Sequence, residues 1–161
     1  ALRPPGLFTR PAEPEDRDFQ RALFLSARPH LQSLPLPGAA LAQLLDQQYD
    51  FQQADYQRRF AGAPRLIVQA SGVPIGALTV HDNGADLHIV DIVITPAVRG
   101  QGYGAALLRW VQGSAAVLGR RVTLSVDAAN HGAQRLYARL GFASSGIDAV
   151  QLGMAWHPPA A

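Results

Sequence analysis

The sequence predicts an α+β (mixed α/β) fold, in which one sheet carries helices on its faces. A chain of 161 residues has a suitable length for one hydrophobic core. Apolar segments spaced as hairpin-connected strands fill the middle of the chain, and a strand–helix–strand crossover follows them. Neither a repeat nor a low-complexity tract divides the sequence. We therefore expect a single domain over residues 1–161.

The first third of the chain predicts one strand and two helices. A short strand is expected over 7–10. Glu15 and Asp16 are acids of the kind that favour a helix start, and this helix should end where Pro29 follows. A second helix is expected over 39–60, where apolar residues recur at helical spacing.

The middle third predicts three antiparallel strands joined by turns. The strands are expected over 66–68, 75–80 and 87–94. Asn83-Gly84, between the second and third of them, is the strongest short hairpin signal. The third strand is nearly continuously apolar, which favours burial on both of its faces.

The last third predicts a parallel crossover and a final strand. We expect a loop over 95–102, a helix over 103–118, a strand over 122–126, a helix over 133–140 and a strand over 150–156.

The composition excludes several kinds of chemistry. The chain has no cysteine, so it cannot form disulfides, thiolate nucleophiles or acyl-cysteine intermediates. Its 14 basic residues are all arginine, which excludes a Schiff-base lysine and a Walker-type phosphate loop. The histidines show no metal-ligand spacing, so no metal site is expected. We expect the following in loops: His30, His81, His131 and His157.

Charge and hydropathy predict location and partners. The net charge is +2 and the pI is near 9.5, but the arginines are scattered, so nucleic acid is not an expected partner. No apolar run approaches the roughly 20 residues of a membrane span, and none near the first residues resembles a secretory signal. The expected location is the cytoplasm.

A glycine-rich stretch over 99–104, R-G-Q-G-Y-G, follows the third middle strand and opens the next helix. Backbone N–H groups at a helix start lack internal partners and carry about half a positive charge. Glycines let an anion approach that backbone closely, and Arg99 adds a permanent cation. The stretch therefore predicts a pyrophosphate site, the alternative being a loop that only turns the chain.

The same stretch also fits a dinucleotide fingerprint. Gly100 to Ala105 matches G-x-G-x-x-A, and Asp127 follows at about 20 residues. In that fold the strand runs almost directly into the first glycine, whereas here five residues, including Pro96, intervene. The antiparallel strands before the loop also disfavour a doubly wound sheet, so this interpretation is the weaker one.

Two motifs together resemble the GNAT (GCN5-related N-acetyltransferase) superfamily. Arg99-x-x-Gly102-x-Gly104 resembles its acyl-CoA loop, [Q/R]-x-x-G-x-[G/A]. Asn130, Leu136-Tyr137 and Gly141-Phe142 resemble its second signature, N-x-x-A-x-x-L-Y-x-x-x-G-F. The resemblance covers roughly residues 66–154. It implies a central mixed, mostly antiparallel, splayed seven-stranded sheet flanked by about four helices, consistent with the element order above.

The resemblance implies acetyl-CoA as the acyl donor. In the family, the strand before the loop splays from its neighbour, and its exposed backbone pairs with the pantetheine arm. The loop holds the pyrophosphate, and Asn130 hydrogen-bonds the cofactor while it can also cap the following helix. The implied cofactor-binding residues are Ile92, Val93, Ile94, Arg99, Gly100, Gln101, Gly102, Tyr103, Gly104 and Asn130.

The catalytic residues follow from the same resemblance. Tyr137 matches the tyrosine that protonates the departing thiolate, the alternative being an aromatic packed on Phe142. Ser125 stands where some relatives carry a glutamate base, and His88 stands where others do. His88 and Asp91 are the candidate bases, expected on opposite faces of one strand by simple alternation, with water-mediated deprotonation left open.

The implied function is an acetyl-CoA-dependent N-acetyltransferase that transfers acetyl directly to a primary amine in a ternary complex. The alternative is a non-catalytic acyl-CoA-binding module. The expected partner is a small-molecule or peptide amine, its identity open, and a homodimer also stays open; no membrane is expected. In the family the early helices border the acceptor pocket, so Asp50 and Asp55 either attract a cationic amine or belong to a solvated helix face.

Overall fold

A computed structural model describes residues 6–148 and 150–160 of the chain. The strands are β1 (Leu7–Pro11), β2 (Arg65–Ala70), β3 (Val73–Asp82), β4 (Asp86–Ile94), β5 (Arg121–Asp127), β6 (Ala143–Ile147) and β7 (Gln151–Trp156). The helices are η1 (Pro14–Asp16), α1 (Arg17–Ser26), α2 (Pro29–Gln32), α3 (Gly38–Arg59), η2 (Pro96–Val98), α4 (Tyr103–Leu118) and α5 (His131–Arg139).

The strands form one seven-stranded sheet in the order β1-β2-β3-β4-β5-β7-β6. Only β4 and β5 pair in parallel, and every other neighbouring pair is antiparallel. The predicted α+β fold with a mixed, mostly antiparallel sheet is therefore confirmed. The antiparallel run from β1 to β4 also rules out the doubly wound sheet that the dinucleotide alternative requires.

Two elements have no clear signal in the sequence. Strand β6 is exposed along its whole length and consists of small or polar residues except at its end, so it lacks the apolar alternation of a half-buried strand. Helix α1 ends before Pro29, as expected. Pro29 is also the first residue of the short helix α2, a position that suits proline. His30 consequently lies in α2, His81 in β3 and His131 in α5, so their prediction as loop residues was wrong.

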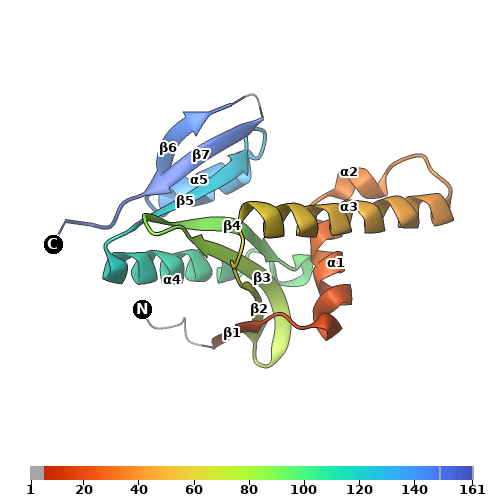
Figure 1. Cartoon of the computed structure of the whole chain (residues 1–161), viewed down its shortest axis with the longest axis horizontal. Helices are drawn as coiled ribbons and strands as arrows, with labels where there is room; N and C mark the ends of the chain where they lie inside the picture. Colours follow the sequence, from red (N-terminus) through yellow and green to blue (C-terminus); the bar gives the residue numbers. More distant parts are fainter. Residues whose placement is uncertain (1–5, 149, 161) are drawn as a thin grey trace.

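The two faces of the sheet are covered by different helices. Adjacent residues of β3 show this division, because Leu78 packs in the core cluster with α4 residues, whereas Ala77 packs with Leu23 of α1. In Figure 1, α1, α2 and α3 gather at one end of the molecule, β5, β6, β7 and α5 gather at the other, and β4 lies between them. Strand β4 lies in the middle of the sheet, where the two halves of the molecule meet.

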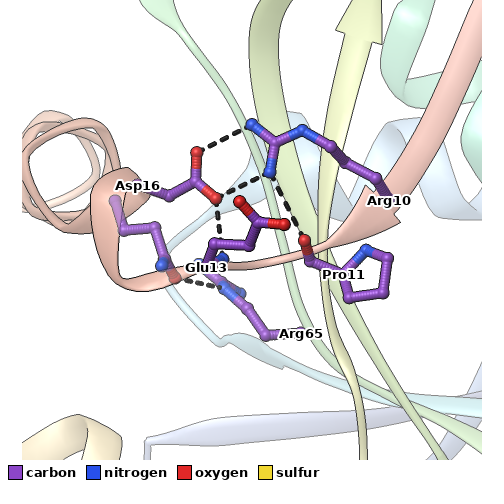
Figure 2. Close-up of polar contacts among 6 residues, drawn as sticks. Arg10, Pro11, Glu13, Asp16 and Arg65 are labelled. Atoms are coloured by element: carbon purple, nitrogen blue, oxygen red, sulfur yellow. Dashed lines mark hydrogen bonds and ion pairs between the residues drawn. The ribbon is translucent and has the colours of Figure 1, made fainter.

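The turn between β1 and α1 is fixed by an ion pair. Both terminal nitrogens of Arg10 bind the carboxylate of Asp16, at 2.7 and 2.8 Å, and the backbone N–H of Glu13 also donates to it (Figure 2). Asp16 is 8% exposed. The Arg10 hydrogen bonds, with the Glu13 N–H, lower the pKa of Asp16 to about 2. This carboxylate anchors the start of α1 to the edge of the sheet.

Candidate functional site

Strands β4 and β5 separate halfway along their length. They pair from Asp86 with Arg121 to Ile89 with Leu124, and no pair follows within the described residues. Beyond that point β4 continues to Ile94, while β5 continues beside β7. The predicted splay is therefore present, and it leaves one side of the β4 backbone beyond Ile89 without a neighbouring strand.

A bulge in β4 decides which side chains face the opening. Thr79 of β3 pairs with Asp91 and Val80 with Ile89, which leaves Val90 as an extra residue. The extra residue shifts the alternation, so His88 and Asp91 lie on the same face and line the same cavity. The expectation that they lie on opposite faces was wrong, because two-residue alternation holds only in an unbulged strand.

The cavity that both residues line, here called the α3 cavity, has a volume of about 650 Å³. One wall is formed by α3 residues from Phe51 to Arg59 and by Phe60, which directly follows the helix. Strand β4 forms the floor, and Asp148 and Gln151 beside the β6–β7 turn form the far wall. Ser125 of β5 also lines it. A cavity of this size suits a small molecule.

His88 is held firmly within the α3 cavity. Its Nδ1 lies 2.9 Å from the hydroxyl of Thr123 on β5, and its ring stacks on Phe60 with centroids 5.4 Å apart. Burial, followed by the charges of His81 and Arg59, lowers the pKa of His88 below its usual 6.5. The imidazole is therefore mostly neutral at pH 7, and its Nε2 has no partner among the described residues.

Asp91 is ion-paired. Its Oδ2 lies 2.8 Å from a terminal nitrogen of Arg65, and the same arginine also donates to Thr79 and to Gln20 of α1. Figure 2 shows Arg65 beside the β1–α1 turn. One oxygen of Asp91 is therefore occupied by a structural cation, unlike the unpaired Nε2 of His88.

The glycine-rich loop borders a second hollow, here called the loop groove, of about 540 Å³. Its lining comes from the end of β4, the loop, the first turn of α4 and α5: Ile94, Val98, Arg99, Gly100, Gly102, Tyr103, Gly104, Ala105, Ala133, Leu136 and Arg139. Strand β4 therefore borders both hollows, through residues 88–91 in one and Ile94 in the other.

The loop presents backbone donors to this groove. Within the described part of the chain, the N–H groups of residues 100–105 have no hydrogen-bond acceptor. Gly100 and Gly102 have positive φ angles of 78° and 87°, a conformation that strains other residues. Gln101 is exposed and does not line the groove, so the structure gives its side chain no role there. The arrangement is that of an anion site.

Arg99 points along β4 rather than over the helix start. Its Nε donates to the carbonyl of Ile94 at 3.0 Å, and a terminal nitrogen lies 3.3 Å from the Ser26 hydroxyl of α1. The side chain still lines the loop groove, so its charge lies at the edge of the predicted pyrophosphate site.

Asn130, which directly precedes α5, and Tyr137, which lies within it, differ in burial. Asn130 caps the helix, its Oδ1 accepting from the N–H of Ala133 at 3.1 Å. Tyr137 is half-buried and packs edge-on against Phe142, with centroids 5.8 Å apart. Burial raises the pKa of Tyr137, and the charge of Asp91 adds to the rise. The phenol therefore keeps its proton at neutral pH.

The carboxylates of α3 do not offer a free cation site. Asp50 pairs with Arg17 at 2.9 Å, and Asp55 pairs with both Arg58 and Arg59, at 2.5 and 3.2 Å. Of the two, only Asp55 lines the α3 cavity. These arginines already neutralise the charges that would attract a cationic amine.

Sequence reasoning assigned no role to three charged residues of the cavity wall: Arg59, Asp148 and Arg28. Of these, Arg28 is the one that the sequence signals least. It lies between α1 and α2, about 60 residues before the β4 residues that it joins in the α3 cavity. No motif contains it, and its spacing from the β4 residues carries no periodic signal. Only the packing of the early helices over the sheet reveals it.

Comparison with known proteins identifies a family whose model this chain matches. The model of the "Acetyltransferase (GNAT) family" matches residues 30–142. Curated relatives described as uncharacterized N-acetyltransferases, from Mycobacterium tuberculosis (strain ATCC 25618 / H37Rv) and Mycobacterium bovis, are 35% identical over 78 residues. That stretch is 48% of this chain and 50% of each relative, so the chain spans about half the length of the curated relatives it matches.

Solved structures share the fold. The PaiA N-acetyltransferase of Thermoplasma acidophilum, in complex with coenzyme A, superposes with a TM-score of 0.68 at 14% identity, covering 94% of this chain and 98% of that one. The Vibrio cholerae spermidine N-acetyltransferase, in complex with CoA and spermine, gives 0.64 at 18% identity, covering 94% and 95%. A nourseothricin acetyltransferase gives 0.55 at 25% identity, covering 62% and 67%.

Two further observations concern the described residues only. None of their helices is both long and apolar enough to cross a bilayer. They also contain no cluster of three histidine, cysteine or acidic residues arranged to hold a metal ion.

Proposed function

Because this chain belongs to the acetyltransferase (GNAT) family, we propose that it transfers acetyl from acetyl-CoA directly to a primary amine. The observation that carries the proposal is the course of β4. This strand borders the loop groove at one end and the α3 cavity further along, and between them its backbone faces the splay. A donor and an acceptor bound in the two hollows would meet there.

The donor would bind along β4 and the loop. The backbone of Ile92, Val93 and Ile94 would pair with the pantetheine arm as an added strand does. The unpaired N–H groups of residues 100–105 would hold the pyrophosphate, with Arg99 at its edge. Asn130 has its Oδ1 engaged as a helix cap, so its amide N–H₂ would be the group available to the donor.

Transfer needs a neutral amine and a proton for the leaving thiol. The amine nitrogen would form a bond to the acetyl carbon, and the carbon–sulfur bond would break. His88 would accept the proton that the amine loses, through Nε2 or an intervening water, since its lowered pKa keeps it neutral. Tyr137 would donate its proton to the thiolate, since its raised pKa keeps it protonated.

His88 is a better base than Asp91 on this geometry. Both face the α3 cavity, but Asp91 is paired with Arg65 whereas Nε2 of His88 is unpaired within the described residues. Asp91 would then be a positioning residue that links β4 to β2. Direct transfer also fits a chain that contains no cysteine for an acyl-enzyme.

Turnover of acetyl-CoA with a panel of primary amines tests the proposal through release of free thiol. Amine-dependent thiol release is the expected result. Acetyl-CoA at a hundredfold excess over its Kd should also stabilise the fold by about 2.7 kcal/mol, and NAD should not. Binding of acetyl-CoA without turnover on any amine would instead favour the non-catalytic module, for which Ser125 in the cavity is the motivating residue.

Three further expectations concern the domain organisation, the cellular location and the association of two copies. We propose that the sheet and its helices form a single acyl-CoA-binding acetyltransferase domain, and that the protein works in the cytoplasm. Fractionation of cells would test the location. Light scattering would test whether two copies associate.

A further inference from the structure

Arg28 places a fixed guanidinium in the wall of the α3 cavity. The side chain is half-buried, and its guanidinium lies 4.1 Å from the centre of the Phe24 ring. One terminal nitrogen, Nη1, donates to the carbonyl of Phe24 at 3.2 Å. These two contacts hold the group in place. Its Nε and Nη2 have no acceptor among the described residues.

In the described part of the chain, the other ionised groups around the cavity have partners that engage their charged atoms, whereas the Nε and Nη2 of Arg28 have none. The cavity's second arginine, Arg59, is paired with Asp55, and Asp91 is paired with Arg65. Asp148 is exposed, and its Oδ1 accepts two backbone N–H groups. Within the described residues, Arg28 is therefore the one cavity-lining arginine that lacks a carboxylate partner.

An unpaired, half-buried guanidinium is poised for an anion. Burial removes part of its hydration, and an anionic ligand restores the lost interactions. With Nη1 engaged, Nε and Nη2 remain as two parallel donors along one edge, which match the two oxygens of a carboxylate. Tyr56 of α3 lines the same cavity, and its hydroxyl has no partner among the described residues.

We infer that Arg28 binds a carboxylate of the acceptor, so that the acceptor is a small amine that also carries a carboxylate, such as an α-amino acid. The inference rests on the proposed transferase function. The carboxylate would lie on Arg28, and the amine would lie beside His88 on the floor of the same cavity. A polyamine would instead need unpaired carboxylates; Asp55 and Asp91 are already paired with arginines, and the remaining cavity-lining carboxylate, Asp148, has one oxygen engaged by two backbone N–H groups.

The test compares acceptors that differ only in the carboxylate. The twenty α-amino acids, their methyl esters and spermidine are assayed for thiol release with the wild-type chain and the Arg28→Gln variant. For the best amino acid, Arg28→Gln should raise KM by about 10- to 100-fold, the worth of a charge-assisted bidentate contact. KM for its methyl ester and for acetyl-CoA should change less than about threefold. Comparing variants on one acceptor cancels differences in amine pKa.

Two further variants keep the test specific. Arg58→Gln removes the same charge from an arginine that pairs with Asp55 but does not line the α3 cavity, so KM for the amino acid should change less than about threefold. Arg28→Lys keeps the charge and most of the packing but loses the two-pronged edge, so its KM should lie between those of wild type and Arg28→Gln. If Arg28→Gln does not fold, Arg28→Lys still tests whether the two-pronged contact of Arg28 is needed for binding of the amino acid.

The outcomes separate the two ideas. Preference of the wild type for spermidine or the esters would overturn the inference and leave the transferase function standing. So would an equal effect of Arg28→Gln on the amino acid and its ester, or an effect of Arg58→Gln as large as that of Arg28→Gln. Absence of transfer to every amine, with acetyl-CoA still bound, would overturn the proposed function and the inference with it.

Discussion

Replacing His88 by glutamine is the sharpest test of the proposed base. Glutamine keeps a polar side chain on the β4 floor but cannot accept a proton at neutral pH. Since the folded pKa of His88 lies below 6.5, more than about three quarters of the imidazole is neutral at pH 7. Loss of a general base should therefore lower kcat by about 10²- to 10⁴-fold at that pH.

The pH profile provides the decisive assay. In the wild type, kcat/KM should fall as pH drops through the pKa of His88, hence with a bend below pH 6.5. In the His88→Gln variant this bend should disappear. Survival of both the bend and the rate in the variant would refute the assignment and leave Asp91 or ordered water as the acceptor of the proton.

The contact with Thr123 supplies a matched control. Thr123→Val keeps the shape of the side chain but removes the hydroxyl that lies 2.9 Å from Nδ1. One hydrogen bond is worth about 1 kcal/mol, so the orientation of the ring should loosen and kcat should fall only about fivefold. The bend in the profile should remain, because the base is still present. A Thr123→Val variant as slow as His88→Gln would mean that the hydroxyl contributes as much to the rate as the imidazole does.

Three other predictions concern the loop, the proton donor and the fold. Gly104→Val should raise the Kd of acetyl-CoA more than about tenfold without unfolding the chain, because a Cβ at this lining residue of the loop groove would meet no atom within 4 Å. Calorimetry with an unchanged Kd would contradict this prediction. Tyr137→Phe should lower kcat by about 10²- to 10⁴-fold and stability by less than about 1.5 kcal/mol, whereas near-full kcat would assign the proton to solvent. Asp16→Asn should lower the free energy of unfolding by about 1–2 kcal/mol at neutral pH, after allowance for the partly exposed Arg10. Because the pKa of Asp16 is about 2 in the folded chain and near 4 in the unfolded chain, the stability advantage of the wild type should hold above pH 4 and vanish as pH falls toward 2. Urea titrations at several pH values measure this difference, and a difference that stays constant with pH would refute the prediction.

Local sequence signals were sufficient for most elements. Helix α4 was expected over 103–118 and spans Tyr103–Leu118, because Gly102 and Gly119 flank it in left-handed conformations that glycine adopts without strain. Gly102, together with Gly100, also shapes the loop that exposes backbone N–H groups, so the loop and its chemistry could be predicted together. Strand β6 could not, because its pairing with β7 rather than its own apolar pattern makes it a strand.

The sequence by itself determined most strands of the sheet, the loop and the family signature, because glycine conformation, apolar periodicity and capping act between neighbours in the chain. Only the tertiary structure decided which side chains meet in the α3 cavity. Pairing with β3 sets the bulge at Val90 and brings His88 and Asp91 to one face. Packing of the early helices leaves Arg28 unpaired there among the described residues. Bulges and ion pairs join residues that are distant in the chain, so no local pattern encodes them.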